Sequence, residues 1–429
     1  MHLASPIPRP RVLHVSQPVD GGVARVVQDL VAAQTAAGLD VHVACPAEEA
    51  TLPSGEAAFP AGEVACPAGE SGGFPGTHAR VHAWAATRSP GPRLRSEVRG
   101  LARIVDAVRP DLVHAHSAKA GLAARLAVRG RLPTVFQPHA WSFEAVDGAT
   151  AVLSRAWERY GARWTARLVC VSEAERRRGL RAGVRGAARV VPNGVDLDRY
   201  RPAATRDGRA ALPLPDAVRD PAAPLVVCVG RLCRQKGQDV LLRAWPTVTA
   251  ALPGARLALV GDGPDAGALR AAADASVLFA GAAADAVPWY RAADVVVLPS
   301  RWEGMALAPL EAMACARPVV VTAVDGARES LPPALVPHAL VPPEDPVALA
   351  RALVALLRDR DLRDRLGERA HAHVRDHHDV RRAAAAIEEV YRELLAAQGT
   401  YAAAVEPAYT AATEPSYAAA TEYRESTNP

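Results

Sequence analysis

Short apolar runs alternate along the chain with longer stretches rich in Ala, Leu and Arg. The runs in the first 200 residues are RVLHVS, VHVAC, LVHAH, TVFQP, RLVCVS and RVVPN, and those after residue 224 are PLVVCVG, RLALVGD, VLFAG, VVVLPS and PVVVTA. Continuously apolar strands separated by helices are typical of parallel sheets covered on both faces. The pattern predicts an α/β fold with two doubly wound, Rossmann-like domains, in which ligands bind at the carboxyl ends of the strands.

A stretch rich in Pro and polar residues separates the two groups of strands, and 429 residues exceed what one core usually organises. The expected units are an N-terminal domain over 1–200, a linker over 201–224, a C-terminal domain over 225–382 and a helix over 383–398 that packs back on the N-terminal domain.

Two segments carry neither pattern. Residues 46–77 are rich in Pro, Gly, Ala and Glu and predict an irregular excursion from the N-terminal domain. Residues 399–429 carry an imperfect repeat with little to bury, which predicts a disordered tail that is dispensable for chemistry.

Composition and charge indicate where in the cell the protein is expected to act. No apolar run approaches the roughly 18 to 20 residues of a membrane span, and the first residues lack the pattern of a signal peptide. The six cysteines lack C-x-x-C spacing, which favours reduced thiols and a cytoplasmic location. Residues 1–205 hold 26 basic against 18 acidic side chains, and the rest hold 24 against 28. This basic half is either a solvated face or a surface for peripheral contact with the inner face of an anionic membrane.

The most informative segment is 294–330. Its apolar strand ends in a polar turn with Glu303, and a helix that begins near Met305 exposes amides that can bind an anion. Glu311 lies eight positions after Glu303 and projects from the young helix, where a carboxylate can accept two hydrogen bonds from a ribose. Two glutamates at this spacing also occur on solvated helix faces.

Two further loops follow predicted strands. Arg231 and Lys236 lie in GRLCRQKG, where a planar guanidinium and a mobile ammonium suit the dispersed charge of a diphosphate. Lys236 is one of only two lysines, the other being Lys119. Gly21 and Gly22 allow the backbone to approach a ligand, although a tight turn would explain them equally well.

Together these segments resemble glycosyltransferase family 4, the large retaining family of GT-B architecture, whose E-x7-E donor signature matches Glu303 and Glu311. The other matching segments, in chain order, are DGGVARVVQDL, HAHSAKAG, VCVSEAERR, VPNGVDLDRY, GRLCRQKG and LVGDGP. The resemblance implies a retaining hexosyl- or related glycosyltransferase. Its donor is a nucleotide diphosphate sugar, and its acceptor is a glycan or lipid-linked glycan in bacterial polysaccharide assembly.

The resemblance also implies roles for individual residues. Catalytic roles fall on His139, Arg231, Lys236 and Glu303. Donor binding falls on Gly21, Gly22, Arg231, Lys236, Gly281, Glu303, Gly304, Met305, Ala306, Leu307 and Glu311. His116 and Lys119 are candidate contacts to the acceptor. Ala306 stands where the family commonly has Gly, and its added methyl group is expected to tighten sugar selection or slow the enzyme.

No metal or other cofactor is expected. The D-x-D formed by Asp196 and Asp198 lies near the domain boundary and is interpreted as incidental. A zinc site at His114 and His116 would need a third ligand that the sequence does not supply.

Two other functions share the architecture, a nucleotide-sugar epimerase and a catalytically silent nucleotide-sugar-binding protein. Nucleic acid is not an expected partner, because the basic stretch 176–189 lacks interleaved aromatic residues.

Overall fold

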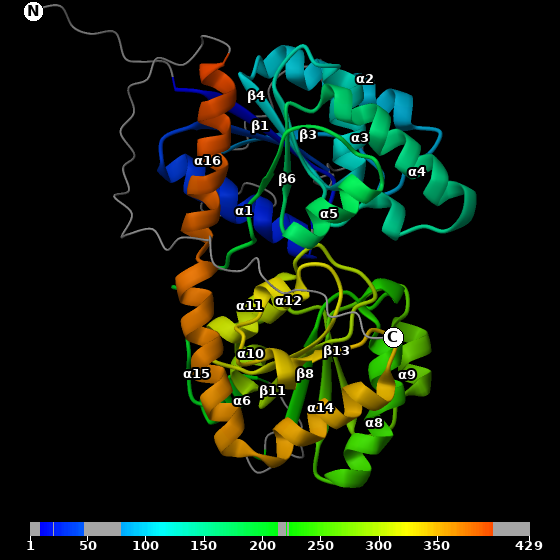
Figure 1. Ribbon diagram of the computed structural model, residues 1–429, viewed down its shortest axis with the longest axis vertical. Coiled ribbons are helices and arrows are strands. Elements are labelled where there is room, and N and C mark those ends of the chain that lie inside the picture. The colour runs from blue at the N-terminus through cyan, green and yellow to red at the C-terminus, as the bar shows by residue number, and fades with distance from the viewer. Residues whose placement is uncertain (1–8, 20, 47–78, 213–219, 221–222, 398–429) are drawn as a thin grey trace, which may run out of the picture.

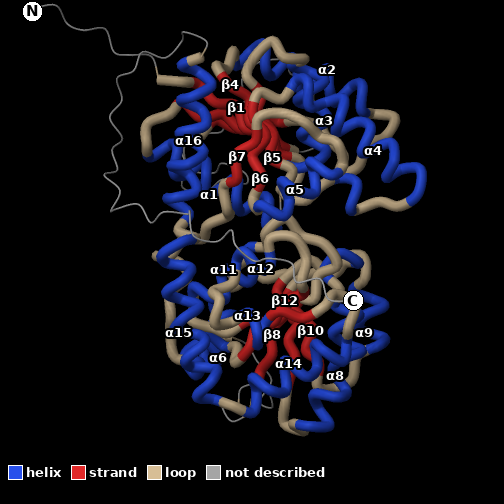
Figure 2. The backbone as a smooth tube through the Cα atoms, in the orientation of Figure 1, coloured by secondary structure: helices blue, strands red, loops and turns tan. Residues whose placement is uncertain are grey.

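The computed structural model describes residues 9–19, 21–46, 79–212, 220 and 223–397. Residues 47–77 of the predicted excursion, most of the second half of the predicted linker and the whole predicted tail lie outside this part of the chain. Figure 1 shows two α/β halves stacked along the long axis of the molecule, and Figure 2 shows a sheet at the centre of each half. The predicted fold class, two Rossmann-like domains, is confirmed.

The N-terminal half is built on a seven-stranded sheet in the order β3-β2-β1-β4-β5-β6-β7, and all its pairings are parallel. Its strands are β1 Arg11–Ser16, β2 Asp40–Cys45, β3 Arg80–Ala83, β4 Leu112–His116, β5 Thr134–Gln137, β6 Arg167–Cys170 and β7 Ala188–Val190. Its helices are α1 Gly21–Ala36, α2 Leu94–Val108, α3 Ser117–Val128, α4 Gly148–Gly161 and α5 Glu173–Arg181. Successive residues of β1 and β4 are buried, because helices cover both faces of the sheet.

The C-terminal half has a six-stranded parallel sheet in the order β10-β9-β8-β11-β12-β13. Its strands are β8 Leu225–Val229, β9 Arg256–Val260, β10 Val277–Gly281, β11 Val295–Leu298, β12 Val319–Thr322 and β13 Leu340–Val341. Its helices are α6 Thr205–Ala210, α8 Gln238–Ala251, α9 Ala266–Ala272, α10 Val287–Ala292, α11 Leu307–Ala314, α12 Ala327–Ser330, α13 Val336–Ala339, α14 Pro346–Arg358 and α15 Arg360–His377. The strand order reverses between β8 and β11, and ligands of such sheets bind beside this point at the carboxyl ends of the strands.

The last described helix, α16 Val380–Ala396, returns to the N-terminal half. Its Ile387 and Val390 pack in one apolar cluster with Val12 of β1 and Leu112 of β4. Figure 1 shows α15 and α16 following each other along one side of the molecule. The chain therefore crosses between the halves near residue 194 and again near residue 379.

The two crossings lie side by side. Val195 and Asp379 form an isolated parallel bridge, with Val195 N donating to His378 O at 2.8 Å and Val380 N donating to Val195 O at 3.1 Å. A Cβ on Gly194 would lie 2.6 Å from Val380 Cα, so the two segments can approach this closely only with glycine there.

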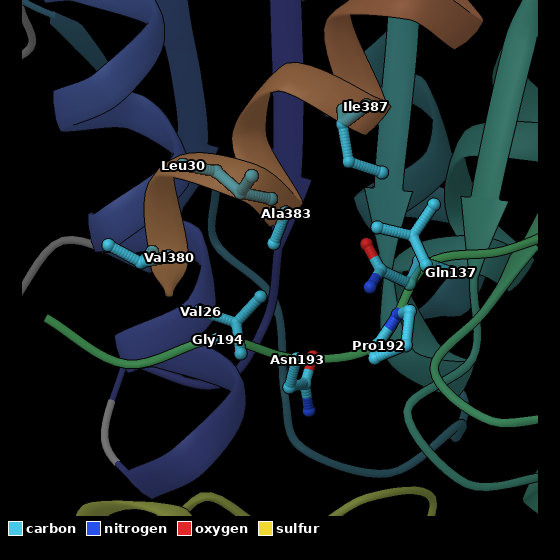
Figure 3. Close-up of a pocket in the computed structure, with 10 residues that line it drawn as sticks. Val26, Leu30, Gln137, Pro192, Asn193, Gly194, Val380, Ala383 and Ile387 are labelled. Carbon is cyan, nitrogen blue, oxygen red and sulfur yellow. The ribbon is translucent and has the colours of Figure 1, made fainter. Parts of the chain in front are cut away.

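A small cavity lies beside the crossings (Figure 3), with a volume of about 20 Å³. Val26 and Leu30 of α1, Ile387 of α16 and Asn193 of the crossing segment are among its lining residues. This volume admits about one water molecule, so the cavity cannot be a sugar site.

Candidate active site

The loop after β8 brings Lys236 to the carboxyl end of β11. Gly237 makes this possible, because its φ is +66° and a Cβ there would lie 2.1 Å from Pro299 O. Lys236 Nζ lies 2.5 Å from Glu303 Oε1, and Ser300 Oγ donates to the same oxygen at 2.7 Å. The Lys236 side chain is 20% exposed and that of Glu303 is 11% exposed, so the pair is partly accessible from the surface.

Arg231 lies five residues earlier in the same loop. It is exposed, and among the described residues its guanidinium forms neither an ion pair nor a hydrogen bond. Its backbone is held in place, because Gln238 Nε2 donates to Arg231 O at 3.0 Å. An unpaired guanidinium close to the carboxyl end of β8 remains available for an anionic ligand.

Helix α11 begins beside this pair. Ala306 precedes it and provides no side-chain cap for the first turn. Ala306, Ser300 and Glu303 line a pocket of about 10 Å³ next to α12. The start of α11 therefore keeps the amides that the sequence predicted as an anion site, close to the Lys236–Glu303 pair.

Glu311 projects from α11 into a different environment. Its Oε1 accepts a hydrogen bond from the Tyr200 hydroxyl at 2.8 Å, and its Oε2 accepts one from the Tyr290 hydroxyl at 2.6 Å. Burial is the main cause that raises the pKa of both tyrosines, so each keeps its hydroxyl proton. Each carboxylate oxygen can accept a further hydrogen bond, so a ribose would have to share Glu311 with the tyrosines.

The loop between Glu303 and α11 touches the N-terminal half. A Cβ on Gly304 would lie 2.9 Å from Val171 Cγ2 and 3.0 Å from both His139 C and Ala140 N. Asn193 Nδ2 donates to Met305 O at 2.7 Å. These contacts place His139 beside the predicted donor loop.

His139 lies in a strained backbone segment after β5. Its φ is +56° and that of Ala140 is +109°, a conformation that is uncommon outside glycine. The buried Glu175 holds the segment, because Ala140 N donates to Glu175 Oε1 at 2.7 Å and Val171 N donates to Oε2 at 2.7 Å. Burial is the largest cause of a pKa of about 7 for Glu175.

Charged contacts also join the two halves around the donor loop. The Glu329 carboxylate of α12 accepts hydrogen bonds from the first amides of α5, Glu173 N at 2.7 Å and Ala174 N at 2.8 Å. Arg178 of α5 pairs with Asp325. The structure therefore shows a closed arrangement in which the amino end of α5 holds a side chain from the opposite half.

The remaining predicted residues lie in three environments. Gly21 and Gly22 are exposed at the start of α1, and Gly281 ends β10 with a φ of +74°. Lys119 is buried, with its Nζ 2.5 Å from Glu97 Oε2, and His116 is fully buried. Neither of these two side chains reaches the surface in this structure, and their contact with an acceptor stays a prediction.

Both carboxylates of the D-x-D sequence, Asp196 and Asp198, contact other groups of the chain. Asp196 Oδ1 accepts from the backbone of Asp198 at 2.9 Å and of Arg199 at 3.2 Å, and Asp198 pairs with Arg381. Tyr290 and Asn193 are functional-site contacts that were not predicted from the sequence. Asn193 lies in the matching segment VPNGVDLDRY but reaches Met305 across 112 residues, and Tyr290 reaches Glu311 from 21 residues before it, so neither contact follows from a local pattern.

Two Rossmann-like halves, each built on a parallel sheet, define the GT-B class of glycosyltransferase. Within that class, the chain belongs to glycosyltransferase family 4. Residues 20–199 match the family model described as Glycosyltransferase Family 4, and residues 223–359 match the one described as Glycosyl transferases group 1.

Individual relatives agree with this assignment. The lipopolysaccharide core biosynthesis mannosyltransferase LpcC of Rhizobium leguminosarum bv. viciae is 36% identical over 217 residues, which cover 48% of this chain and 60% of that protein. Sucrose-phosphate synthase from Thermosynechococcus elongatus has 25% identity and a TM-score of 0.73, covering 91% of this chain and 100% of that one. Anabaena Alr3699/HepE in complex with UDP and glucose has 21% identity and a TM-score of 0.72, covering 90% and 100%, and shows the fold alone. The matched region is thus less than two thirds of the length of the curated relatives.

Proposed function

We propose that the chain is a retaining glycosyltransferase that moves a sugar from a nucleotide diphosphate sugar to an acceptor hydroxyl. The observation that carries the proposal is the grouping at the carboxyl ends of β8 and β11. There Arg231, whose guanidinium has no partner among the described residues, shares one loop with Lys236, and the Lys236–Glu303 pair lies just before the uncapped start of α11. This set suits a diphosphate, which needs dispersed positive charge and amide donors.

The proposed reaction breaks the bond between the anomeric carbon and the β-phosphate oxygen, whose electron pair stays on the phosphate. The acceptor oxygen bonds to the anomeric carbon, and its proton is released with the nucleotide diphosphate. Lys236, Arg231 and the amides at the start of α11 stabilise the negative charge that grows on the β-phosphate. Closure of the two halves excludes water from the reacting sugar.

The same charges support the proposal that the reaction needs no metal ion, since in the proposed complex they neutralise the diphosphate, which a divalent cation does in other enzymes. The experiment is to incubate the full chain with UDP-, GDP- and ADP-sugars in EDTA and to follow release of the nucleotide diphosphate. Release in EDTA is the expected result. Activity that appears only after manganese or magnesium is added would contradict the metal-independent proposal.

Product analysis separates the alternatives. An epimerase returns a changed nucleotide sugar without releasing nucleotide diphosphate, and a silent binding protein binds the nucleotide sugar without turnover. The matched relative LpcC acts in lipopolysaccharide core biosynthesis, which supports a glycan or lipid-linked glycan as the acceptor class.

We further propose that α4 and α5 form a peripheral membrane contact. Their exposed apolar side chains are Val152, Leu153, Tyr160 and Leu180, from 45% to 71% exposed. Exposed arginines accompany them on both helices, namely Arg155, Arg159, Arg177 and Arg181. Arg159 of α4 donates to Ala182 O, which caps α5, so the carboxyl ends of the two helices are in contact. Apolar side chains interspersed with arginine suit an anionic lipid surface.

Sedimentation with phosphatidylglycerol vesicles tests this surface. Leu153→Asp is expected to reduce binding, whereas Val347→Asp, at an exposed apolar position on α14, should leave it unchanged. Equal binding by both variants would contradict the proposed membrane contact. Within the described ranges, no helix combines the length and apolar character needed to cross a membrane.

A further inference from the structure

A chain of hydrogen bonds runs inward from the candidate site through buried side chains. His139 Nε2 lies 3.2 Å from His116 Nδ1, and His116 Nε2 lies 3.0 Å from His14 Nδ1. His14 Nε2 lies 2.8 Å from Gln34 Oε1 on α1. His14, His116 and Gln34 are fully buried, so water cannot take the place of any of these contacts.

The sheet register explains why these histidines meet. His14 of β1 stands opposite His114 of β4, and Ser16 stands opposite His116. Side chains alternate between the faces of a strand, so His14, His114 and His116 project to the same face. Gln34 covers that face from α1, and Tyr391 covers it from α16.

In the structure the Gln34 amide directs its nitrogen at Tyr391 and its oxygen at His14. Gln34 Nε2 donates to the Tyr391 hydroxyl at 3.4 Å, and that hydroxyl lies 2.6 Å from His114 Nδ1. With the amide nitrogen directed at Tyr391, the carbonyl oxygen Oε1 is the atom directed at His14.

This orientation sets the direction of the whole chain. A carbonyl oxygen only accepts, so His14 Nε2 carries the hydrogen and His14 Nδ1 accepts from His116 Nε2. By the same rule His116 Nδ1 accepts from His139 Nε2. Such a chain requires neutral rings, and burial lowers the pKa of His14 to about 4 and that of His139 to about 3.

We infer that Gln34, His14 and His116 are positioning residues that fix the tautomer of His139, with the hydrogen on Nε2 and a lone pair on Nδ1. His139 is then a neutral hydrogen-bond acceptor, suited to a hydroxyl of the donor sugar and unsuited to protonating a leaving group. The sugar contact rests on the proposed function, whereas the tautomer does not.

A metal site is the competing interpretation of the same cluster. One nitrogen from each of His14, His114 and His116 lies within 4.8 Å of the others, so the structure supplies the third histidine that the sequence did not. A closed zinc site takes four ligands, and in the described part of the chain the group holds three. The two short ring contacts of His116 are already accounted for as hydrogen bonds.

Histidine ring nitrogen shifts of the 15N-labelled full chain measure the tautomers directly. At pH 7.5 we expect His139 to show a protonated Nε2 and an unprotonated Nδ1, with its signals identified by their loss in His139→Asn. Gln34→Met removes the terminal acceptor and should mix the tautomers, whereas Gln34→Glu keeps an oxygen acceptor and should retain them. His338→Gln, at an exposed position, should leave the other rings unchanged.

Kinetics provide a second readout. One neutral hydrogen bond corresponds to a roughly 3- to 10-fold loss of kcat in Gln34→Met, with the donor KM within about 2-fold and recovery in Gln34→Glu. A His139 ring protonated on Nδ1, tautomers unchanged in Gln34→Met, or stoichiometric zinc in the purified protein would each overturn the inference. If Gln34→Met fails to fold, the wild-type tautomers still decide the question. Absence of turnover with every donor would refute the proposed function and leave the tautomer assignment standing.

Discussion

Replacing Lys236 with Met removes one positive charge and keeps a side chain of similar length. In the structure the ammonium lies 2.5 Å from Glu303 Oε1, and Ser300 is the other partner of that carboxylate. An ammonium about 4 Å from a phosphate charge gains about 4 kcal/mol at an effective dielectric constant of about 20. Loss of one preorganised electrostatic donor typically costs about 100- to 1000-fold in kcat, or roughly 3 to 4 kcal/mol. Without Lys236, Glu303 would also face the diphosphate unneutralised, which favours the upper end of this range.

The assay is release of nucleotide diphosphate at a series of donor concentrations, so that kcat and KM are obtained separately. Arg234→Met is the matched control, because Arg234 lies in the same loop, is exposed and carries the same charge. We expect its kcat to stay within about 3-fold of wild type, as is usual where no charge develops nearby. A Lys236→Met enzyme with near-native kcat and only a raised KM would refute the reasoning, since Lys236 would then bind substrate and transition state equally.

Three further outcomes are expected. Glu311→Ala should weaken binding of nucleotide diphosphate by about 1.5 to 3 kcal/mol for each charge-assisted hydrogen bond lost, whereas Glu303→Ala should mainly impair transfer. Equal losses in calorimetric titrations with nucleotide diphosphate and with sugar nucleotide would contradict this division. Gly304→Ala should lower turnover, because its Cβ would hinder closure of the two halves, while nucleotide diphosphate affinity stays near native. Unchanged turnover would contradict this, since the loop around Gly304 would then accommodate the added methyl group. Acid should destabilise the fold, because His14 and His139 have pKa values of about 4 and 3 when folded, below the usual 6.5. Their stabilisation is complete above pH 6.5 and is lost as the pH falls toward 4, at up to about 1.4 kcal/mol per pH unit for each ring. Urea denaturation of the wild type and of His139→Asn at pH 7.5 and 5.5 isolates the His139 contribution, because Glu175, with its pKa raised to about 7, acts in the opposite direction in both proteins. The same pH dependence in both proteins would contradict the prediction.

The two-domain fold was predictable because its signal is local. A strand buried on both faces must be apolar at every position, and runs such as PLVVCVG show this without knowledge of the partner strands. The proximity of Lys236 and Glu303 was also within reach, since both follow strands whose carboxyl ends share one sheet edge.

The rest of the site depends on pairings that no local pattern encodes. Glu311 was assigned to a ribose from its place on a helix, yet Tyr200, 111 residues earlier, bonds its carboxylate. The histidine cluster depends on the register between β1 and β4, which brings His14 beside His114 across 100 residues of chain. The sequence of β4 shows only His114 and His116, and the third histidine of the cluster, His14, comes from β1.

The return of α16 to the N-terminal half has a consequence for synthesis on the ribosome. The face of the first sheet that contains Val12 and Leu112 is covered by Ile387 and Val390, which are among the last described residues to be made. The first half therefore cannot complete its core when its own strands have emerged, and an apolar sheet face stays open while the whole second half is translated. Such a face is a binding surface for chaperones and a risk for aggregation until the final helix arrives.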